Sequence, residues 1–242
     1  MQSSLQLLDR MRNRKDAKGL GFQQGTLRQG FYIRLGKRIF DFVFSAVGLL
    51  ILSPLFVVVA VCIKLTSRGS VFFHQTRVGR DGNPFPIVKF RSMFEIASRM
   101  PPGITVSSDS RITRVGRILR RYKIDELPQL WNVFLGDMSF VGPRPELPKY
   151  VEAYSADQRQ VLRVRPGITD LASLAYRHEE EILCDREDPE KIYCTEILPD
   201  KLSQNLTYIQ QISFWNDVRI IFATLAHSFL MVKKNPNRVK NR

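Results

Sequence analysis

The chain has 242 residues, enough for one globular domain or for one domain with a membrane element, and too few for a large multidomain assembly. Apolar residues at 44% and charged residues at 25% exclude intrinsic disorder, collagen and coiled coil as descriptions of the whole chain. The 37 basic and 23 acidic residues leave a net charge of +14, which predicts an anionic partner: nucleic acid, an anionic membrane surface or a phosphorylated substrate. The three cysteines form no CxxC pair, so they favour a reducing cytoplasm over a disulfide framework or a zinc site.

A long apolar run follows a basic N-terminal lead at residues 1–36. Residues 42–63 carry no charge, and at about 1.5 Å per residue a helix of this length reaches about 33 Å, enough to cross a hydrocarbon core of about 30 Å. Ser53-Pro54 stands in the middle of the run, where proline lacks a backbone donor and favours a bend. Basic residues flank both ends, and positive charge prefers the cytoplasmic side. We therefore expect residues 37–68 to form a re-entrant helix-break-helix anchor in one leaflet; a kinked spanning helix is the alternative.

The segment after this anchor has the composition of β-strands. Residues 70–78 and 85–93 are rich in Val, Ile, Phe and Thr, and the segment between them at residues 80–83 contains an Asp-Gly pair that favours a tight turn. These features predict a β-hairpin with Lys89 and Arg91 on the returning strand.

A helix is expected next, from a cap at Ser108 or Asp109 to about Tyr122. Apolar residues recur along it at helical spacing, and arginines occupy the other face. That face is either a solvated surface or part of an anion-binding site. Its members are Arg111, Arg114, Arg117, Arg120 and Arg121.

Two adjacent carboxylates, Asp125 and Glu126, open the segment at residues 124–150. On a helix they would point about 100° apart, so one can attack a phosphorus while the other holds a divalent ion. The alternative is structural: Asp125 caps a helix through Gln129 and Trp131, and Glu126 favours its dipole. Cationic side chains that suit a diphosphate accompany the pair. They are Arg120, Lys123, Lys89, Arg91 and Arg144. Arg144 stands between two prolines, which fix the backbone on both sides of it. This arrangement suits either a positioned anion clamp or a rigid surface turn.

Several motifs together resemble the bacterial sugar transferase family, the monotopic polyprenyl-phosphate phosphoglycosyl transferases. The resemblance covers about residues 37–169, with a weaker echo at Trp215-Asn216-Asp217. It implies the re-entrant anchor, and the lack of a multi-span N-terminal region implies the minimal catalytic form. The motifs are Lys89-Phe90-Arg91-Ser92-Met93, Asp125-Glu126-Leu127-Pro128-Gln129-Leu130, Gly136-Asp137-Met138-Ser139, Gly142-Pro143-Arg144-Pro145 and Arg165-Pro166-Gly167-Ile168-Thr169.

The resemblance implies transfer of a phospho-sugar from a UDP-sugar to polyprenyl phosphate, with release of UMP. Asp125 matches the nucleophile of a ping-pong mechanism, which passes through a covalent phospho-sugar on its carboxylate. Glu126 matches the carboxylate that helps to hold Mg²⁺. Lys89, Arg120 and Arg144 would position the phosphates, with Arg91 and Arg165 as weaker candidates. Such an enzyme starts lipid-linked glycan synthesis, of an exopolysaccharide, an O-antigen or a glycoprotein glycan, at the cytoplasmic face of the bacterial inner membrane and needs no nucleic acid.

Two other classes of protein account for part of the sequence. A membrane-tethered nucleic-acid-binding protein would explain the net charge, and a non-enzymatic scaffold would explain the anchor. Neither explains a carboxylate pair flanked by separate basic motifs. The predicted fold is α+β, with the hairpin in a catalytic domain at residues 69–200 and with interfacial or packing helices and a basic tail at residues 201–242.

Overall fold

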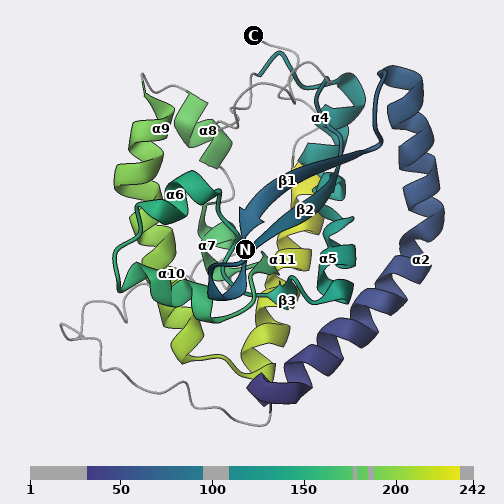
Figure 1. Ribbon diagram of the computed structural model, residues 1–242. Coiled ribbons are helices and arrows are strands. Elements are labelled where there is room, and N and C mark those ends of the chain that lie inside the picture. Colours follow the sequence, from purple (N-terminus) through teal and green to yellow (C-terminus); the bar gives the residue numbers. More distant parts are fainter. Residues whose placement is uncertain (1–31, 95–108, 177–178, 185–187, 235–242) are drawn as a thin grey trace.

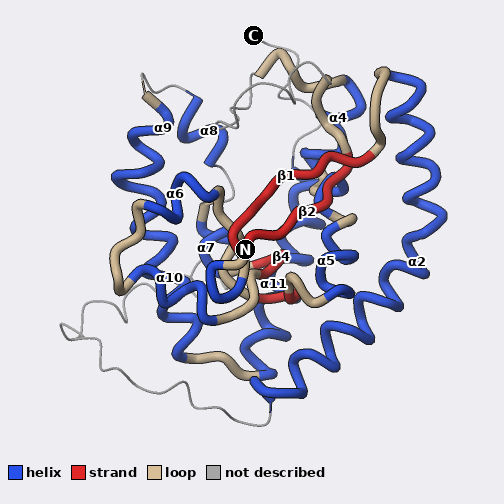
Figure 2. The backbone as a smooth tube through the Cα atoms, viewed as in Figure 1, coloured by secondary structure: helices blue, strands red, loops and turns tan. Residues whose placement is uncertain are grey.

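The computed structural model describes residues 32–94, 109–176, 179–184 and 188–234. Most of these residues are helical, and the strands form two small two-stranded sheets (Figure 1; Figure 2). The predicted α+β class is confirmed in this coarse sense. The N-terminal lead up to residue 31 and the basic tail from residue 235 lie outside the described residues.

Helices make up most of the described elements. The α-helices are α2 (Lys37–Thr66), α4 (Arg114–Arg121), α5 (Gln129–Leu135), α6 (Pro148–Glu152), α7 (Leu171–Ala175), α8 (Glu179–Cys184), α9 (Pro189–Ile192), α10 (Leu198–Gln210) and α11 (Phe214–Lys234). The strands are β1 (Phe72–Val78), β2 (Pro84–Phe90), β3 (Ser139–Val141) and β4 (Gly167–Thr169). Short 3₁₀ or π segments are η1 (Tyr32–Gly36), η2 (Arg80–Gly82), η3 (Ile124–Glu126), η4 (Gln158–Arg163) and η5 (Tyr193–Ile197).

Helix α2 runs without interruption through Ser53-Pro54, so the structure contains one bent helix where two helices were expected. Pro54 has no N–H to donate to the carbonyl of Leu50, one turn earlier. The Ser53 hydroxyl donates to that carbonyl instead, at 2.8 Å. Figure 1 shows the helix bending near its middle. The Ser-Pro pair thus bends α2 while leaving the Leu50 carbonyl with a donor.

Both ends of α2 are attached to the same globular body. Near the N-terminal end, Arg38 donates to two backbone carbonyls of α5 at 2.7 and 2.8 Å, and the buried Asp41 accepts from the Ser139 hydroxyl at 3.1 Å. Near the C-terminal end, Ile63 packs with Phe90 of β2. Among the described residues, α2 is the one helix long and apolar enough to cross a membrane. Its middle exposes large apolar side chains, which include Leu50, Ile51, Val57 and Val58.

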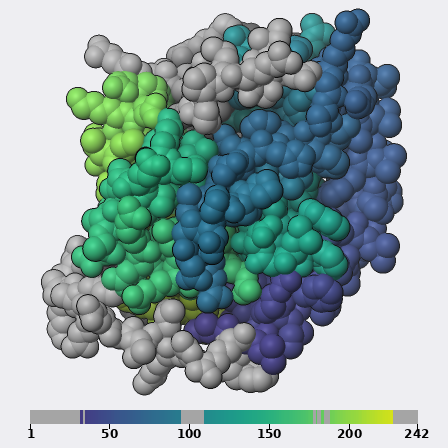
Figure 3. Space-filling model, viewed as in Figure 1, coloured from purple at the N-terminus to yellow at the C-terminus, as the bar shows by residue number. Residues whose placement is uncertain are grey.

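The predicted hairpin is confirmed. Strands β1 and β2 pair antiparallel, with Phe73 opposite Lys89. Asp81 and Gly82 adopt positive φ angles of 57° and 80° in the turn, conformations that the Asp-Gly pair tolerates well. Figure 3 shows the hairpin and α2 at the surface on the same face of the molecule.

Helix α4 begins later than the sequence analysis predicted. Its cap is Thr113, whose hydroxyl accepts from the Gly116 amide at 2.8 Å. Asp109 accepts from the Arg111 amide instead, and Ser108 lies outside the described residues. The delay has a tertiary cause, because Ile112 forms an antiparallel bridge with Met93 and so stays extended.

The second sheet was not predicted. Strands β3 and β4 are parallel, with Ser139 opposite Gly167. A Cβ on Gly167 would lie 2.1 Å from the backbone nitrogen of Gly142, so the two chains approach more closely than another residue permits. This pairing places the motif that contains Arg144 beside the motif that contains Arg165.

The C-terminal helices differ in how they pack. Leu202 and Tyr208 of α10 are buried in the main hydrophobic core. Helix α11 buries Ile220 but leaves Trp215 77% and Phe222 67% exposed. Helix α10 therefore fits the packing alternative. Helix α11 has both a buried residue and exposed apolar residues, as the interfacial alternative requires.

Candidate active site

Asp125 and Glu126 lie on a single 3₁₀ turn, η3, between α4 and α5. Lys123 adopts the left-handed conformation, with φ of 57°, and turns the chain after α4 so that both carboxylates are buried, at 6% and 9% exposure. The structural alternative for Asp125 is wrong, because Pro128 occupies the position before α5 and no side chain caps that helix. The pair is thus held in the interior for another reason than helix capping.

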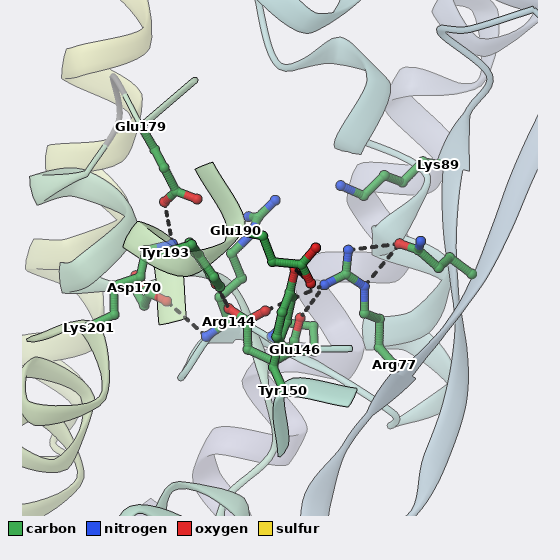
Figure 4. Close-up of polar contacts among 12 residues, drawn as sticks. Arg77, Lys89, Arg144, Glu146, Tyr150, Asp170, Glu179, Glu190, Tyr193 and Lys201 are labelled. Atoms are coloured by element: carbon green, nitrogen blue, oxygen red, sulfur yellow. Dashed lines mark hydrogen bonds and ion pairs between the residues drawn. The ribbon is translucent and has the colours of Figure 1, made fainter. Parts of the chain in front are cut away.

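Glu126 is the centre of two ion pairs. Its Oε1 accepts from Lys89 Nζ at 2.8 Å and from Arg144 Nη2 at 2.5 Å. A longer contact of 3.5 Å joins Arg144 Nη1 to Oε2. Figure 4 shows the Lys89 amine pointing inward from the hairpin. The structure therefore brings together three of the predicted site residues, from β2, η3 and the loop after β3.

The charges of these three groups compensate one another. Burial by itself would raise the pKa of Glu126, but the positive charges of Arg144 and Lys89 outweigh it and hold that pKa well below its usual range. The Glu126 carboxylate in turn raises the pKa of Arg144. Burial lowers the pKa of Lys89, and the same carboxylate opposes that shift. Glu126 is therefore ionised and strongly held.

Asp125 has the opposite environment. Its Oδ1 is buried and has no hydrogen-bond partner among the described residues. Burial, followed by the negative charge of Glu126, raises the pKa of Asp125, and the charges of Lys89, Lys123 and Arg120 only partly oppose this. An oxygen without a hydrogen-bond partner, on a carboxylate whose charge is only partly compensated, is available to attack an electrophile or to bind a cation.

The other predicted basic residues are placed differently. Arg120 lies half-buried on α4, where its charge acts on Asp125, and its contact with a phosphate stays a prediction. Arg91 donates to the backbone carbonyls of Ser67 and Arg68 at 2.9 and 2.7 Å and so closes the C-terminal end of α2. Arg165 donates to the Gly136 carbonyl at 2.8 Å. Both arginines support the backbone, and the contact of Arg91 or Arg165 with a phosphate stays a prediction.

Supporting residues around Arg144 were missed. The Asp170 carboxylate accepts from the Arg144 backbone amide at 2.8 Å. Glu146 accepts from the Tyr193 hydroxyl at 2.6 Å and lies 3.7 Å from Arg77 (Figure 4). Asp170 directly follows the Arg165 motif and could have been found from that position. The pairing of Tyr193 with Glu146 has no sequence signal, because it joins residues 47 positions apart.

Asn132 was also missed, although it lies within the segment that carries the carboxylates. Its amide donates to the Pro86 carbonyl at 2.8 Å and accepts from the Val88 amide at 3.0 Å. These two bonds attach α5 to the hairpin. They therefore help to fix the position of Lys89, the residue after Val88, relative to Glu126.

A divalent cation fits this site only together with a substrate. No group of three or more His, Cys, Asp or Glu side chains that could hold a metal occurs in the part of the chain that the structure describes. Mg²⁺, however, commonly takes one or two carboxylates and completes its shell with water and substrate phosphates. The unpartnered Asp125 Oδ1 and the lightly used Oε2 of Glu126 supply two such oxygens.

Comparison with known proteins places this site in a class. The profile described as bacterial sugar transferase matches residues 32–231, a range that includes the whole site. The chain belongs to the bacterial sugar transferase family. The resemblance seen in the sequence motifs is confirmed.

Particular relatives carry more specific names. The chain is 38% identical over 198 residues to the UDP-glucose:undecaprenyl-phosphate glucose-1-phosphate transferase of Klebsiella pneumoniae. The aligned region covers 80% of this chain and 40% of that protein. The chain is 37% identical over 208 residues to the UDP-N-acetylgalactosamine-undecaprenyl-phosphate N-acetylgalactosaminephosphotransferase of Aeromonas hydrophila, covering 84% and 46%. A UDP-glucose:undecaprenyl-phosphate glucose-1-phosphate transferase of Caulobacter vibrioides is 38% identical over 208 residues, covering 83% and 74%. The chain spans about 40% of the length of several of the curated relatives it matches.

The two carboxylates should respond oppositely to neutralisation. Because burial disfavours the ionised form of Asp125, Asp125→Asn should stabilise the protein at neutral pH, and this gain should shrink as the pH falls from the raised pKa of Asp125 towards its ordinary value of 3.8. Glu126→Gln leaves Lys89 and Arg144 without a countercharge, so it should lower the free energy of unfolding by about 3 kcal/mol. The wild type itself should lose this stabilisation as the pH falls below about 4.5 and Glu126 becomes protonated.

Thermal unfolding in detergent, followed as a function of pH, measures both effects. About 1 kcal/mol corresponds to a shift of about 2 to 4 °C in Tm for a chain of this size. Glu190→Gln, which removes the exposed partner of Lys149, is the matched control and should leave Tm unchanged. Equal destabilisation by Asp125→Asn and Glu126→Gln would contradict the assignment of the two environments.

Proposed function

We propose that this chain transfers a phospho-sugar from a UDP-sugar to polyprenyl phosphate, giving polyprenyl-diphosphate-sugar and UMP. The observation that carries the proposal is the buried carboxylate pair, in which Glu126 is held by Lys89 and Arg144 while Oδ1 of Asp125 has no hydrogen-bond partner. The names of the relatives support both substrate classes, and they differ in the sugar. The product would start the synthesis of a lipid-linked glycan.

The proposed reaction has two displacements at one phosphorus. In the first, a carboxylate oxygen of Asp125 attacks the phosphorus that bears the sugar, the bond from this phosphorus to the bridging oxygen breaks, and UMP leaves with the bonding electrons. In the second, an oxygen of polyprenyl phosphate attacks the same phosphorus and the Asp125 carboxylate is released. Burial of Asp125 favours the first step, because a poorly solvated carboxylate gains most when it forms a bond.

Lys89, Arg144 and Arg120 would position the phosphates of both substrates. Lys89 and Arg144 are already fixed by Glu126, so their cationic groups do not need to be ordered when a diphosphate arrives. Glu126, with Asp125 beside it, is the residue proposed to hold Mg²⁺. The bound ion would neutralise charge on the diphosphate and on the departing UMP.

The membrane placement is part of the same proposal. We propose that α2 is re-entrant and inserts its middle into the cytoplasmic leaflet of a bacterial inner membrane, with the catalytic domain in the cytoplasm. The bend at Pro54, the exposed apolar middle and the attachment of both ends to one body support this placement. Basic residues near both ends favour the cytoplasmic side. The site would then face the phosphate of a lipid whose tail stays in the bilayer.

The covalent step predicts a trapped intermediate. Incubation with a UDP-sugar labelled in the sugar and without polyprenyl phosphate should leave a phospho-sugar on Asp125, detectable by peptide mass spectrometry. Asp125→Asn keeps the size of the side chain and removes its nucleophilicity, so UMP release should fall by at least about a thousandfold. The exposed Asp188→Asn is the control and should keep both adduct and turnover. An adduct on another residue would remove Asp125 from this role.

The metal role predicts a shifted cation dependence. EDTA should abolish UMP release, and Glu126→Gln should raise the Mg²⁺ concentration needed for half-maximal rate at least about tenfold, because one carboxylate ligand is lost. Glu152→Gln, an exposed change on α6, should leave that concentration unchanged. Full activity in EDTA would refute the role of Mg²⁺.

The re-entrant placement predicts that both termini are cytoplasmic. A cysteine introduced into the N-terminal lead should resist a membrane-impermeant thiol reagent in intact cells, as should one in the catalytic domain. Replacing Ser53 by Ala and Pro54 by Leu restores a straight apolar helix long enough to span, so a fraction of molecules should expose the N-terminus outside and lose activity. External labelling of the unmodified N-terminal lead, with the catalytic domain protected, would establish a spanning helix instead.

A further inference from the structure

Helix α4 is held in one rotational position by a close backbone approach. A Cβ on Gly116 would lie 1.9 Å from the Ser92 carbonyl oxygen, so only glycine allows the helix to pack at this distance. The Thr113 amide donates to the same carbonyl at 3.0 Å, and Leu119 packs in one cluster with Ile63 of α2. The side chains that α4 turns outward are therefore determined by its packing.

That outward face combines arginines with large apolar side chains. Arg114, Arg117 and Arg121 are exposed, and Ile118 among them is 57% exposed. The Arg121 guanidinium lies over the ring of the exposed Tyr122, 5.7 Å from its centroid. Helix α4 contains no acidic residue that could balance this charge within the helix. Arginine mixed with exposed apolar side chains is the composition of a helix that lies in a membrane interface.

The same composition continues onto the C-terminal end of α2, beside α4 in Figure 1. Leu65 is 81% exposed there, and Lys64 and Arg68 are exposed on either side of it in the chain. This is the point at which the apolar surface of α2 gives way to basic residues. If the middle of α2 lies among acyl chains, these residues lie at the depth of the headgroups.

We propose that the outward face of α4, together with Lys64 and Arg68, binds the headgroups of anionic phospholipids. The proposal rests on the membrane placement proposed above for α2. The headgroup phosphates supply the negative charge that α4 lacks, and Ile118 enters the apolar boundary below them. Each basic side chain near an anionic surface strengthens the attraction about fivefold. Because α4 leads directly into η3, this contact would hold the Asp125 site at a defined orientation to the bilayer.

Spin-labelled lipids test the proposal on the full chain. The protein is reconstituted into phosphatidylcholine vesicles that contain a trace of spin-labelled phosphatidylglycerol or, separately, of spin-labelled phosphatidylcholine. Electron paramagnetic resonance then gives the fraction of each lipid held motionally restricted at the protein surface. We expect the wild type to prefer phosphatidylglycerol at least about threefold at low salt, and to lose this preference at about 1 M salt, where the Debye length is about 3 Å.

The double variant Arg114→Gln/Arg117→Gln should bring the preference close to one, since it removes two charges from α4. Arg163→Gln/Lys191→Gln removes two exposed charges from η4 and from α9, neither of which belongs to the proposed surface, and should keep the preference. An unchanged preference in the Arg114 and Arg117 variant would overturn the proposal, as would a wild type that does not distinguish the two lipids. Salt-sensitive binding of duplex DNA without lipid preference would also overturn it.

Turnover in neutral detergent separates this proposal from the proposed function. The Arg114 and Arg117 variant should release UMP at the wild-type rate there, because its substitutions lie outside the carboxylate site. A chain that prefers phosphatidylglycerol but releases UMP from no UDP-sugar would support the lipid site and count against the proposed function.

Discussion

The structure of the site depends on one buried carboxylate that two cations share. Glu126 accepts from Lys89 of β2 and from Arg144 of the loop after β3, so its ion pairs join elements distant in the chain. A buried charge without a partner is costly, and loss of Glu126 would leave both Lys89 and Arg144 without their shared countercharge. The hairpin, η3 and the loop around Arg144 must therefore keep their relative positions, and Asp125 is held among them as the carboxylate that lacks such partners.

This arrangement relates substrate binding to the structure of the free protein. A diphosphate that enters the site would contact the same two cations that Glu126 already orders. Lys89 and Arg144 could then neutralise the charge of the substrate without a large rearrangement. Two further residues hold these cations in place by hydrogen bonds to the backbone. Asp170 accepts from the backbone amide of Arg144, and Asn132 accepts from the amide of Val88, on the strand that carries Lys89. In the proposed reaction, α2 and α4 set where this preorganised site stands relative to the lipid substrate.

Elements decided by neighbouring residues were predictable, and those decided by distant contacts were not. The hairpin follows from an Asp-Gly turn between two β-rich runs, and the structure has it. Strands β3 and β4 have three residues each, too few for a period to appear, and their pairing is accompanied by a close approach of Gly142 to Gly167 that the sequence does not reveal. Helix α4 starts at Arg114 because the bridge from Ile112 to Met93 keeps the preceding residues extended, which its own composition does not reveal.

The sequence by itself determined the length of the apolar helix, the hairpin turn, the adjacency of Asp125 and Glu126 and membership of the family, since each depends on residues close together in the chain or on a motif. Only the tertiary structure decided which carboxylate receives the cations and that Arg91 closes the end of α2 rather than facing the site. The physical reason is that desolvation and charge compensation depend on the groups that folding brings within a few ångströms. Neighbours in the sequence do not specify those groups.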